Sequence, residues 1–498
     1  MTCRELKEAF VSNLTGTSLV EVSLGSTLAP LCLISRGLVL ILYHLGKGIL
    51  PFPWNVHFLL DFTIVMLPLV LSCTILSDIL PLVIMTLGAI NISLLFCVYH
   101  RRKHGAGLPM QDVVKNFLQM NLETSCIPFV TVFRVLVNVK TAISILAVDF
   151  PVFPRRYAKT ETYGTGVMDF GVGAFILANS LVCPEARRKD APGSTFSSIF
   201  KQLLSVWPLI FLGMARLISV KIAGYHEHVT EYGVHWNFFF TLAIVRVSAS
   251  ILLALFPVSK SWLLAVIIGG LYQIVLEITE LKSFIIHDSD RTGGFLSANK
   301  EGVFSVIGYI AIYIAGVQVG LYVMQKRTLV KDWIKAICHL LLASFVLWAV
   351  LYICQTFVEP VSRRMANLSF CIWTLAQSLF FLSCISIADV VLVFSKMLSS
   401  CTLVSSSWNP IQNSKPEAQL AEEKIKEKIE GVCLIQAVNR NQLLFFLLAN
   451  IMTGLTNVMV DTVNSNDFFS VCVLLLYMFM NCSIILILHL KKITVKFW

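Results

Sequence analysis

Charged residues are scarce in this chain, at 14% of its 498 residues. Soluble domains usually carry about 25%, so the low value excludes an ordinary soluble fold. No cleavable signal peptide is visible, because residues 1–23 are polar and precede the first long apolar run. The fourteen cysteines form no CxxC pair and no disulfide-like framework, so we interpret them as small apolar packing residues.

What the chain has is long apolar runs. Its composition is 56% hydrophobic, and runs of about twenty residues recur, enough to cross a hydrocarbon core of about 30 Å. This pattern predicts an all-α, polytopic membrane protein, a single multi-span domain over residues 1–498 with about thirteen transmembrane helices. The expected spans lie near 25–45, 57–77, 79–99, 131–149, 164–184, 202–222, 237–257, 262–281, 302–323, 334–355, 367–390, 441–461 and 468–489.

Lys and Arg in the connections predict the orientation, since cytosolic loops are the more basic. The basic set comprises RRKH (101–104), RRK (187–189), KR (326–327), KK (491–492) and the polar stretch at about 396–440, expected to be a cytosolic linker. The alternate set includes 460–467, which has no Lys or Arg. We therefore expect a lumenal amino terminus and a cytosolic carboxyl terminus. A lumenal amino terminus would make Asn13, in the triplet NLT, a glycosylation acceptor.

The net charge of +10 is explained by this topology, so we expect no nucleic-acid partner. Two lumenal loops nevertheless run against the trend: 149–164, and EPVSRRMAN at 359–367. Basic residues on the side that usually has few of them need a local reason, and an anionic partner is the simplest one.

The first of these loops begins with Asp149, directly after the fourth span, and Lys159 follows ten residues later. Pro151 and Pro154 prevent the helix from continuing. An aspartate at a membrane edge can accept a hydroxyl proton, and a nearby lysine can orient it and stabilise an oxyanion. The alternative is an interfacial turn whose basic side chains reach the headgroups. Spacing alone favours this structural alternative.

Other polar residues suggest further contacts. Asp169 and Arg216 lie within apolar runs, where ionisable groups usually face a polar cavity or one another. The segment 225–235 holds several histidines, but without metalloprotease spacing, so we expect no metal site. We interpret His235, Trp236 and Asn237 as part of an interfacial belt. Five further side chains could bind phosphate or sugar hydroxyls: Asn299, Arg363, Arg364, Arg155 and Arg156.

Several motifs together resemble one known family, the phosphatidylinositol-glycan class W family of inositol acyltransferases in glycosylphosphatidylinositol anchor synthesis. They are AVDFPVFPRRYAKTE, MDFGVG, TEYGVHWNFFFT, NKEG, SRRMANL and the closing pattern from Asn439 to Thr462. The resemblance runs from residue 5 to residue 498 and is highly specific in combination.

This resemblance implies residence in the endoplasmic-reticulum membrane. It also implies transfer of a fatty acyl group, usually palmitoyl, from acyl-coenzyme A to the inositol 2-hydroxyl of glucosaminyl-phosphatidylinositol, with no tightly bound cofactor. It implies catalytic roles for Asp149 and Lys159. The resemblance thus favours a catalytic loop over the structural interfacial turn that spacing alone favours. The predicted substrate contacts are Arg155, Arg156, Tyr163, Asp169, Arg216, His235, Trp236, Asn237, Asn299, Arg363, Arg364 and Asn457.

Two other functions stay open at this point. A lipid transporter or scramblase would use intramembrane charges to line a path, but the sequence shows neither inverted repeats nor paired broken helices. An unrelated membrane-bound O-acyltransferase would use an intramembrane histidine, here His339 or His235.

Overall fold

The protein is helical throughout the part that the structure describes. This computed structural model describes residues 10, 12, 14–47, 53–102, 109–123, 127–187, 203–223, 229–288, 290–399, 404–409 and 427–495. The longer helices are α2 (Leu19–Lys47), α3 (Trp54–Asp61), α5 (Leu80–His100), α6 (Met110–Leu118), α7 (Pro128–Ala147), α8 (Val167–Ser180), α10 (Trp207–Ala223), α12 (Phe238–Leu255), α13 (Ser261–Ile278), α16 (Lys300–Val323), α17 (Val330–Phe357), α18 (Leu368–Ser399), α21 (Gln442–Met459) and α22 (Asp467–Leu490).

Shorter helical segments complete the described fold. They are η1 (Phe62–Met66), α4 (Leu67–Ser72), η2 (Arg155–Tyr157), α11 (Val229–Tyr232), η3 (Val258–Lys260), α14 (Leu281–Ile286), α15 (Phe295–Ala298) and α20 (Leu434–Arg440). Strand pairing in the described residues is limited to two isolated bridges, Gly16 with Thr165 and Asn121 with Leu329. The all-α class is therefore confirmed.

Eleven helical segments among the described residues are long and apolar enough to cross a membrane. Each coincides with an expected span, which confirms a polytopic membrane protein. The fifth and sixth expected spans correspond to two shorter apolar helices, Val167–Ser180 and Trp207–Ser219. Thirteen spans were expected, whereas eleven described helical segments reach the spanning length. At the fifth expected span, the apolar composition continues beyond the end of α8, but the backbone already turns at 181–187.

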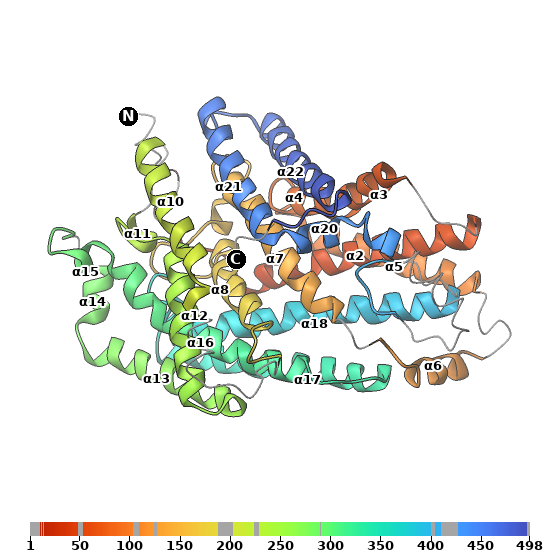
Figure 1. Cartoon of the computed structure of the whole chain (residues 1–498), viewed down its shortest axis with the longest axis horizontal. Helices are drawn as coiled ribbons and strands as arrows, with labels where there is room; N and C mark the ends of the chain where they lie inside the picture. Colours follow the sequence, from red (N-terminus) through yellow and green to blue (C-terminus); the bar gives the residue numbers. More distant parts are fainter. Residues whose placement is uncertain are drawn as a thin grey trace.

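Helix α18 lies at the centre of the bundle. It packs against α17 on one side and α2 on the other, and also contacts α7, α8 and α16 (Figure 1). Small side chains allow this close contact, as membrane helices require. For example, a Cβ on Gly173 of α8 would lie 2.3 Å from Thr374 of α18, so only glycine fits there.

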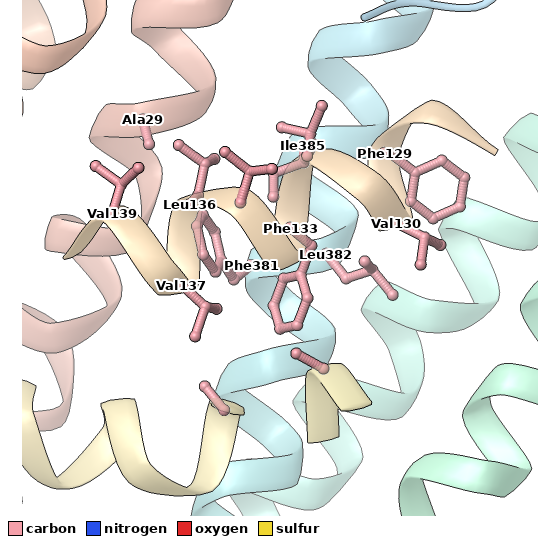
Figure 2. Close-up of a cluster of buried hydrophobic side chains, with 14 of the residues drawn as sticks. Ala29, Phe129, Val130, Phe133, Leu136, Val137, Val139, Phe381, Leu382 and Ile385 are labelled. Carbon is pink, nitrogen blue, oxygen red and sulfur yellow. The ribbon is translucent and has the colours of Figure 1, made fainter. Parts of the chain in front are cut away.

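The apolar core lies where α2, α7 and α18 meet. Figure 2 shows Phe133 and Leu136 of α7 in one apolar cluster with Phe381 and Ile385 of α18. The rings of Phe133 and Phe381 are 5.4 Å apart, and both side chains are buried. Between membrane helices, such van der Waals packing replaces the hydrophobic effect as the main attraction. This rigid contact fixes the axis of α7, whose last turn leads into Asp149.

Part of the predicted 396–440 linker is described, and that part packs against the bundle. Lys396 is buried and donates hydrogen bonds to the carbonyl groups of Val404 (2.9 Å) and Trp408 (3.0 Å). The Trp408 ring is buried 4.7 Å from that of Trp333. Residues 400–403 and 410–426 of the predicted linker lie outside the described residues.

Candidate active site at one end of the bundle

Loops that are far apart in sequence form one layer at the end of the bundle where α2 begins. We call it the loop layer, and it comprises residues 14–18, 148–166, 229–237, 279–288, 290–299, 358–367 and 460–466. Backbone hydrogen bonds join its parts: Thr17 N donates to Thr165 O (2.7 Å), and Gly164 N donates to Val361 O (2.8 Å). The two basic loops singled out in the sequence therefore lie side by side.

Arg155 holds the turn that follows α7. Its guanidinium donates to the carbonyl groups of Val148 (2.9 Å), Phe150 (2.8 Å) and Phe153 (2.9 Å). Carbonyls at a helix end lack intrahelical partners, so an arginine there closes the helix. Burial lowers the pKa of Arg155 to about 10, and the negative charge of Asp149 opposes that shift. Arg155 is thus a structural cap close to the candidate base.

Asp149 is half-buried and is held from the opposite side by α21. The Asn457 side-chain amide donates to its Oδ2 at 2.7 Å. The same amide nitrogen also donates to Thr453 O at 3.2 Å, one turn earlier in α21. Asn457, predicted to contact substrate, therefore sets the direction of the Asp149 carboxylate.

Lys159 forms its ion pair with a residue that the sequence analysis did not select. Its ammonium lies 2.5 Å from Oε2 of Glu231 in α11, and each of the two side chains is 26% exposed. The ring of Tyr232 lies 5.9 Å from the same ammonium. The sequence analysis considers the segment 225–235 as a metal site, which it does not expect, and as an interfacial belt. The available signal was an acidic residue, Glu231, in a segment that has no Lys or Arg.

Asp169 and Arg363 form a buried ion pair at 2.7 Å, with side chains 0% and 2% exposed. The Asp169 carboxylate also accepts from the backbone N–H groups of Thr160 (3.0 Å) and Gly166 (3.1 Å). These contacts tie the 149–166 loop, the start of α8 and the 358–367 loop together. Both residues were predicted to contact substrate, and the structure buries both of them inside the loop layer.

Glu301, buried at the start of α16, joins two arginines. Arg364 lies 2.8 Å from its Oε1, and so does Arg291. Arg364 is itself buried, at 5% exposure. Arg156 differs, because its side chain is 37% exposed while it pairs with Glu21 and Asp78. The Arg156 side chain is thus more accessible than those of Arg363 and Arg364, which are 2% and 6% exposed.

Glu359 is the centre of a second polar cluster. It accepts from the hydroxyl of Tyr163 (2.8 Å), the amide of Gln273 (2.9 Å) and the amide of Asn367 (3.0 Å), and it pairs with Lys282 at 2.8 Å. Burial raises the pKa of Glu359, but these hydrogen bonds outweigh it and bring the pKa below its ordinary value. Tyr163, predicted to contact substrate, is a structural partner here.

The predicted interfacial belt also makes internal contacts. Asn237 caps α12 by accepting from Phe239 N (3.1 Å) and donates to Gly213 O (2.8 Å). Trp236 is buried and donates to the Thr241 hydroxyl at 2.9 Å.

Two further predicted contact residues, His235 and Asn299, meet at the start of α16. The Asn299 side-chain oxygen accepts from His235 N at 2.7 Å. The His235 ring is exposed, with its Nδ1 3.4 Å from the Lys221 ammonium. Arg216 is likewise exposed, on α10.

Remaining predictions can be placed as follows. Within the described residues, no group of three or more His, Cys, Asp or Glu could hold a metal ion. Asn13, His226 and His228 lie outside those residues. His339 contacts the Tyr322 hydroxyl at 2.8 Å in the first half of α17, a helix that begins at the opposite end from the loop layer.

The fold and site define a multi-span helical membrane protein with an aspartate and a lysine in a loop at the end of the bundle. The chain belongs to the GWT1 family, whose model matches residues 3–488. It is 47% identical over 506 residues to the mouse (Mus musculus) protein named glucosaminyl-phosphatidylinositol-acyltransferase PIGW, with 100% of both chains covered. It is 46% identical over 507 residues to the human (Homo sapiens) protein of the same name, again with 100% of both chains covered. It is 35% identical over 512 residues to GPI-anchored wall transfer protein 1 of Yarrowia lipolytica, covering 99% of this chain and 98% of that one.

Proposed function

We infer that this protein is a glucosaminyl-phosphatidylinositol acyltransferase of glycosylphosphatidylinositol-anchor biosynthesis. The observation that carries this inference is the match over the entire chain to the mouse protein of that name. The loop layer supports it, because a half-buried carboxylate held at the end of an apolar helix suits proton removal from a lipid-linked hydroxyl.

The acyl donor we propose is acyl-coenzyme A, with palmitoyl as the transferred group. The inositol 2-hydroxyl loses its proton to a base, and its oxygen forms a bond to the thioester carbonyl carbon. The resulting tetrahedral oxyanion collapses, the carbon–sulfur bond breaks, and coenzyme A leaves as a thiolate that takes up the proton. Since the thioester is already activated, positioning and oxyanion stabilisation are the main tasks of the protein.

Asp149 is the proposed base, and Lys159 the group that stabilises the oxyanion. Asn457 supports the base by donating a hydrogen bond to its Oδ2 at 2.7 Å, which fixes the direction of the carboxylate. Glu231 supports the lysine by fixing its ammonium. Arg156 is the proposed contact to a substrate phosphate, since its side chain is 37% exposed.

The proposed location is the endoplasmic-reticulum membrane, with the loop layer on the lumenal side. Support comes from the excess of Lys and Arg in connections at the other end of the bundle, such as KR at 326–327. The amino-terminal residues 14–18 belong to the loop layer, which fits a lumenal amino terminus.

The decisive experiment is an acyl-transfer assay with purified protein, labelled palmitoyl-coenzyme A and glucosaminyl-phosphatidylinositol. We expect label in the inositol lipid with the parent protein and at least a hundredfold slower transfer with Asp149→Asn. Absence of transfer by well-folded parent protein would refute the proposed activity. Unchanged transfer by Asp149→Asn would refute only the assignment of the base.

A further inference from the structure

The turn that joins α21 to α22 (Figure 1) carries a buried threonine. Thr462 follows α21, which ends at Met459, and it is 0% exposed. The neighbouring Asp461 shapes the turn, because its carboxylate accepts from the Asn464 amide at 2.8 Å and its backbone carbonyl accepts from the Ser465 hydroxyl at 2.6 Å. Such local side-chain bonds hold a turn in one conformation. The position of Thr462 relative to α21 is therefore fixed.

The Thr462 hydroxyl contacts the residue that holds the proposed base. It donates to Oδ1 of Asn457 at 3.4 Å, five residues earlier in the chain. The amide nitrogen of Asn457 donates to Oδ2 of Asp149 at 2.7 Å and to the carbonyl group of Thr453 at 3.2 Å. A chain of side-chain hydrogen bonds therefore runs from Thr462 through Asn457 to Asp149.

These three contacts favour one orientation of the Asn457 amide. An asparagine side chain has an acceptor oxygen and a nitrogen with two hydrogens, and its orientation follows from the groups around it. The carbonyl of Thr453 and an ionised Asp149 are acceptors and require the nitrogen, whereas the Thr462 hydroxyl donates to the oxygen. With the amide reversed, its oxygen would lie against the Thr453 carbonyl and could accept only from a protonated Asp149.

The orientation of this amide decides which form of Asp149 it stabilises. An N–H group that donates to a carboxylate oxygen stabilises the ionised form, which is the form that a base requires. A reversed amide would stabilise the protonated form instead. Arg155 also favours the ionised form, since its guanidinium binds the carbonyl groups of Val148 and Phe150, the residues on either side of Asp149 in the chain.

We propose that Thr462 is a positioning residue for acyl transfer, which acts on the base through Asn457. This inference rests on the proposed function, in which Asp149 removes the proton from the inositol hydroxyl. The Thr462 hydroxyl fixes the Asn457 amide with its nitrogen toward Asp149, and the amide keeps Asp149 ionised between turnovers. Thr462 is itself fully buried, so its effect on the reaction passes through Asn457.

The test separates the hydroxyl of Thr462 from the shape of its side chain. Thr462→Val keeps the shape without the hydroxyl, and Thr462→Ser keeps the hydroxyl. The matched control is Thr456→Val, since the Thr456 hydroxyl donates to Met452 O at 2.8 Å within its own helix. Acyl transfer from palmitoyl-coenzyme A is measured with the full-length protein in detergent.

A second measurement does not depend on acyl transfer. Dicyclohexylcarbodiimide reacts with protonated carboxyl groups, and its attachment to Asp149 is followed by mass spectrometry from about pH 4 to about pH 8. The pH at which half of Asp149 reacts is compared among the parent and the variants. Asp149→Asn, which lacks the carboxyl group, gives the background.

We expect Thr462→Val to lower kcat about three- to tenfold, with KM for the lipid little changed. The midpoint of carbodiimide modification should move to higher pH, because the ionised form of Asp149 has lost part of its support. Thr462→Ser should restore both quantities, and Thr456→Val should match the parent. In an Asn457→Leu background, Thr462→Val should cause no further loss.

An unchanged midpoint in Thr462→Val would overturn the proposal, even with a lower kcat, since a purely structural role would explain that loss. A Thr462→Ser variant as impaired as Thr462→Val would also overturn it. If Thr462→Val does not fold, Thr462→Ala removes the same hydroxyl and takes its place. If the parent transfers no acyl group but the midpoint still moves in Thr462→Val, the proposed function fails while the effect of Thr462 on Asp149 stands.

Discussion

The ammonium of Lys159 lies 2.5 Å from the Glu231 carboxylate, and the two side chains are equally exposed. Lys159 is in the connection between α7 and α8, whereas Glu231 is in α11, so the pair joins two separate loops. A lysine side chain has many rotamers, and an ion pair that restricts them reduces the entropy lost when the ammonium meets a developing oxyanion. We therefore predict that Glu231 positions Lys159 for the proposed reaction.

Replacing Glu231 by Gln should lower kcat about tenfold while changing KM for the lipid little, because the change affects the orientation of Lys159. In a Lys159→Met background the same replacement should have almost no further effect. Glu280→Gln, at an exposed carboxylate in the same layer, is the matched control. Additive losses from Glu231→Gln and Lys159→Met would show that Glu231 does not act through the lysine.

Asn457→Leu should lower kcat, since the Asp149 carboxylate loses the amide that donates to it at 2.7 Å. A loss of about ten- to hundredfold is expected, smaller than that of Asp149→Asn, because the base itself is retained. Asn450→Leu, which removes an amide about two turns earlier in α21, is the control for helix stability. A normal rate in Asn457→Leu, measured by acyl transfer, would contradict this positioning role.

Arg363→Met should destabilise the protein by about 3–5 kcal/mol, the usual cost of leaving a buried charge unpaired. The effect should appear as a lower midpoint of thermal unfolding in detergent. Adding Asp169→Asn should restore part of the loss, because the uncompensated carboxylate is then removed. If Arg363→Met instead unfolded like the parent and only raised KM for the lipid, the residue would be a substrate contact as the sequence analysis predicted.

The Glu359 cluster predicts how stability depends on pH. Its hydrogen bonds depress the folded-state pKa below the ordinary glutamate value of about 4.3. A depressed carboxylate pKa contributes stability that is fully present above the unfolded-state pKa and is lost as pH falls through the folded-state pKa. As the pH falls from about 6 to about 3, the midpoint of thermal unfolding should therefore fall further for the parent than for Glu359→Gln. Parallel losses in the two proteins would contradict this account.

A glycosylation reporter tests the orientation. Asn13 should be modified in a microsomal system, and a tag after the last residue should be accessible from the cytosol. A glycan-free Asn13 together with a protected carboxyl-terminal tag would invert the proposed topology.

Helices were predictable from the sequence because apolar length depends on local composition alone. The expected span 302–323 matches α16, and 334–355 matches the middle of α17. Helix α18 extends to Ser399, beyond the expected 390, since the ammonium of Lys396 is satisfied by carbonyl groups that come later in the chain. Such a contact cannot be read from the composition of the run itself.

The candidate site was predictable in part. A turn with Asp149 between an apolar run and two prolines is visible in the sequence. The partners of Asp149 and Lys159 are not, because each pair joins loops that only the packing of α7, α11 and α21 brings together. Arg155 and Arg363 appeared as free basic groups, since sequence spacing does not show the carbonyls and the carboxylate that bind them.

The hydrogen bond between Asp149 and Asn457 joins residues separated by 308 positions. During synthesis, the helix that carries the aspartate enters the membrane long before α21 is made. The proposed base therefore gains its Asn457 contact only when α21 has been inserted, and a chain released early has the aspartate without that support. Nascent and truncated forms would remain inactive at the ribosome and in the translocon, so that acylation begins only with the complete protein.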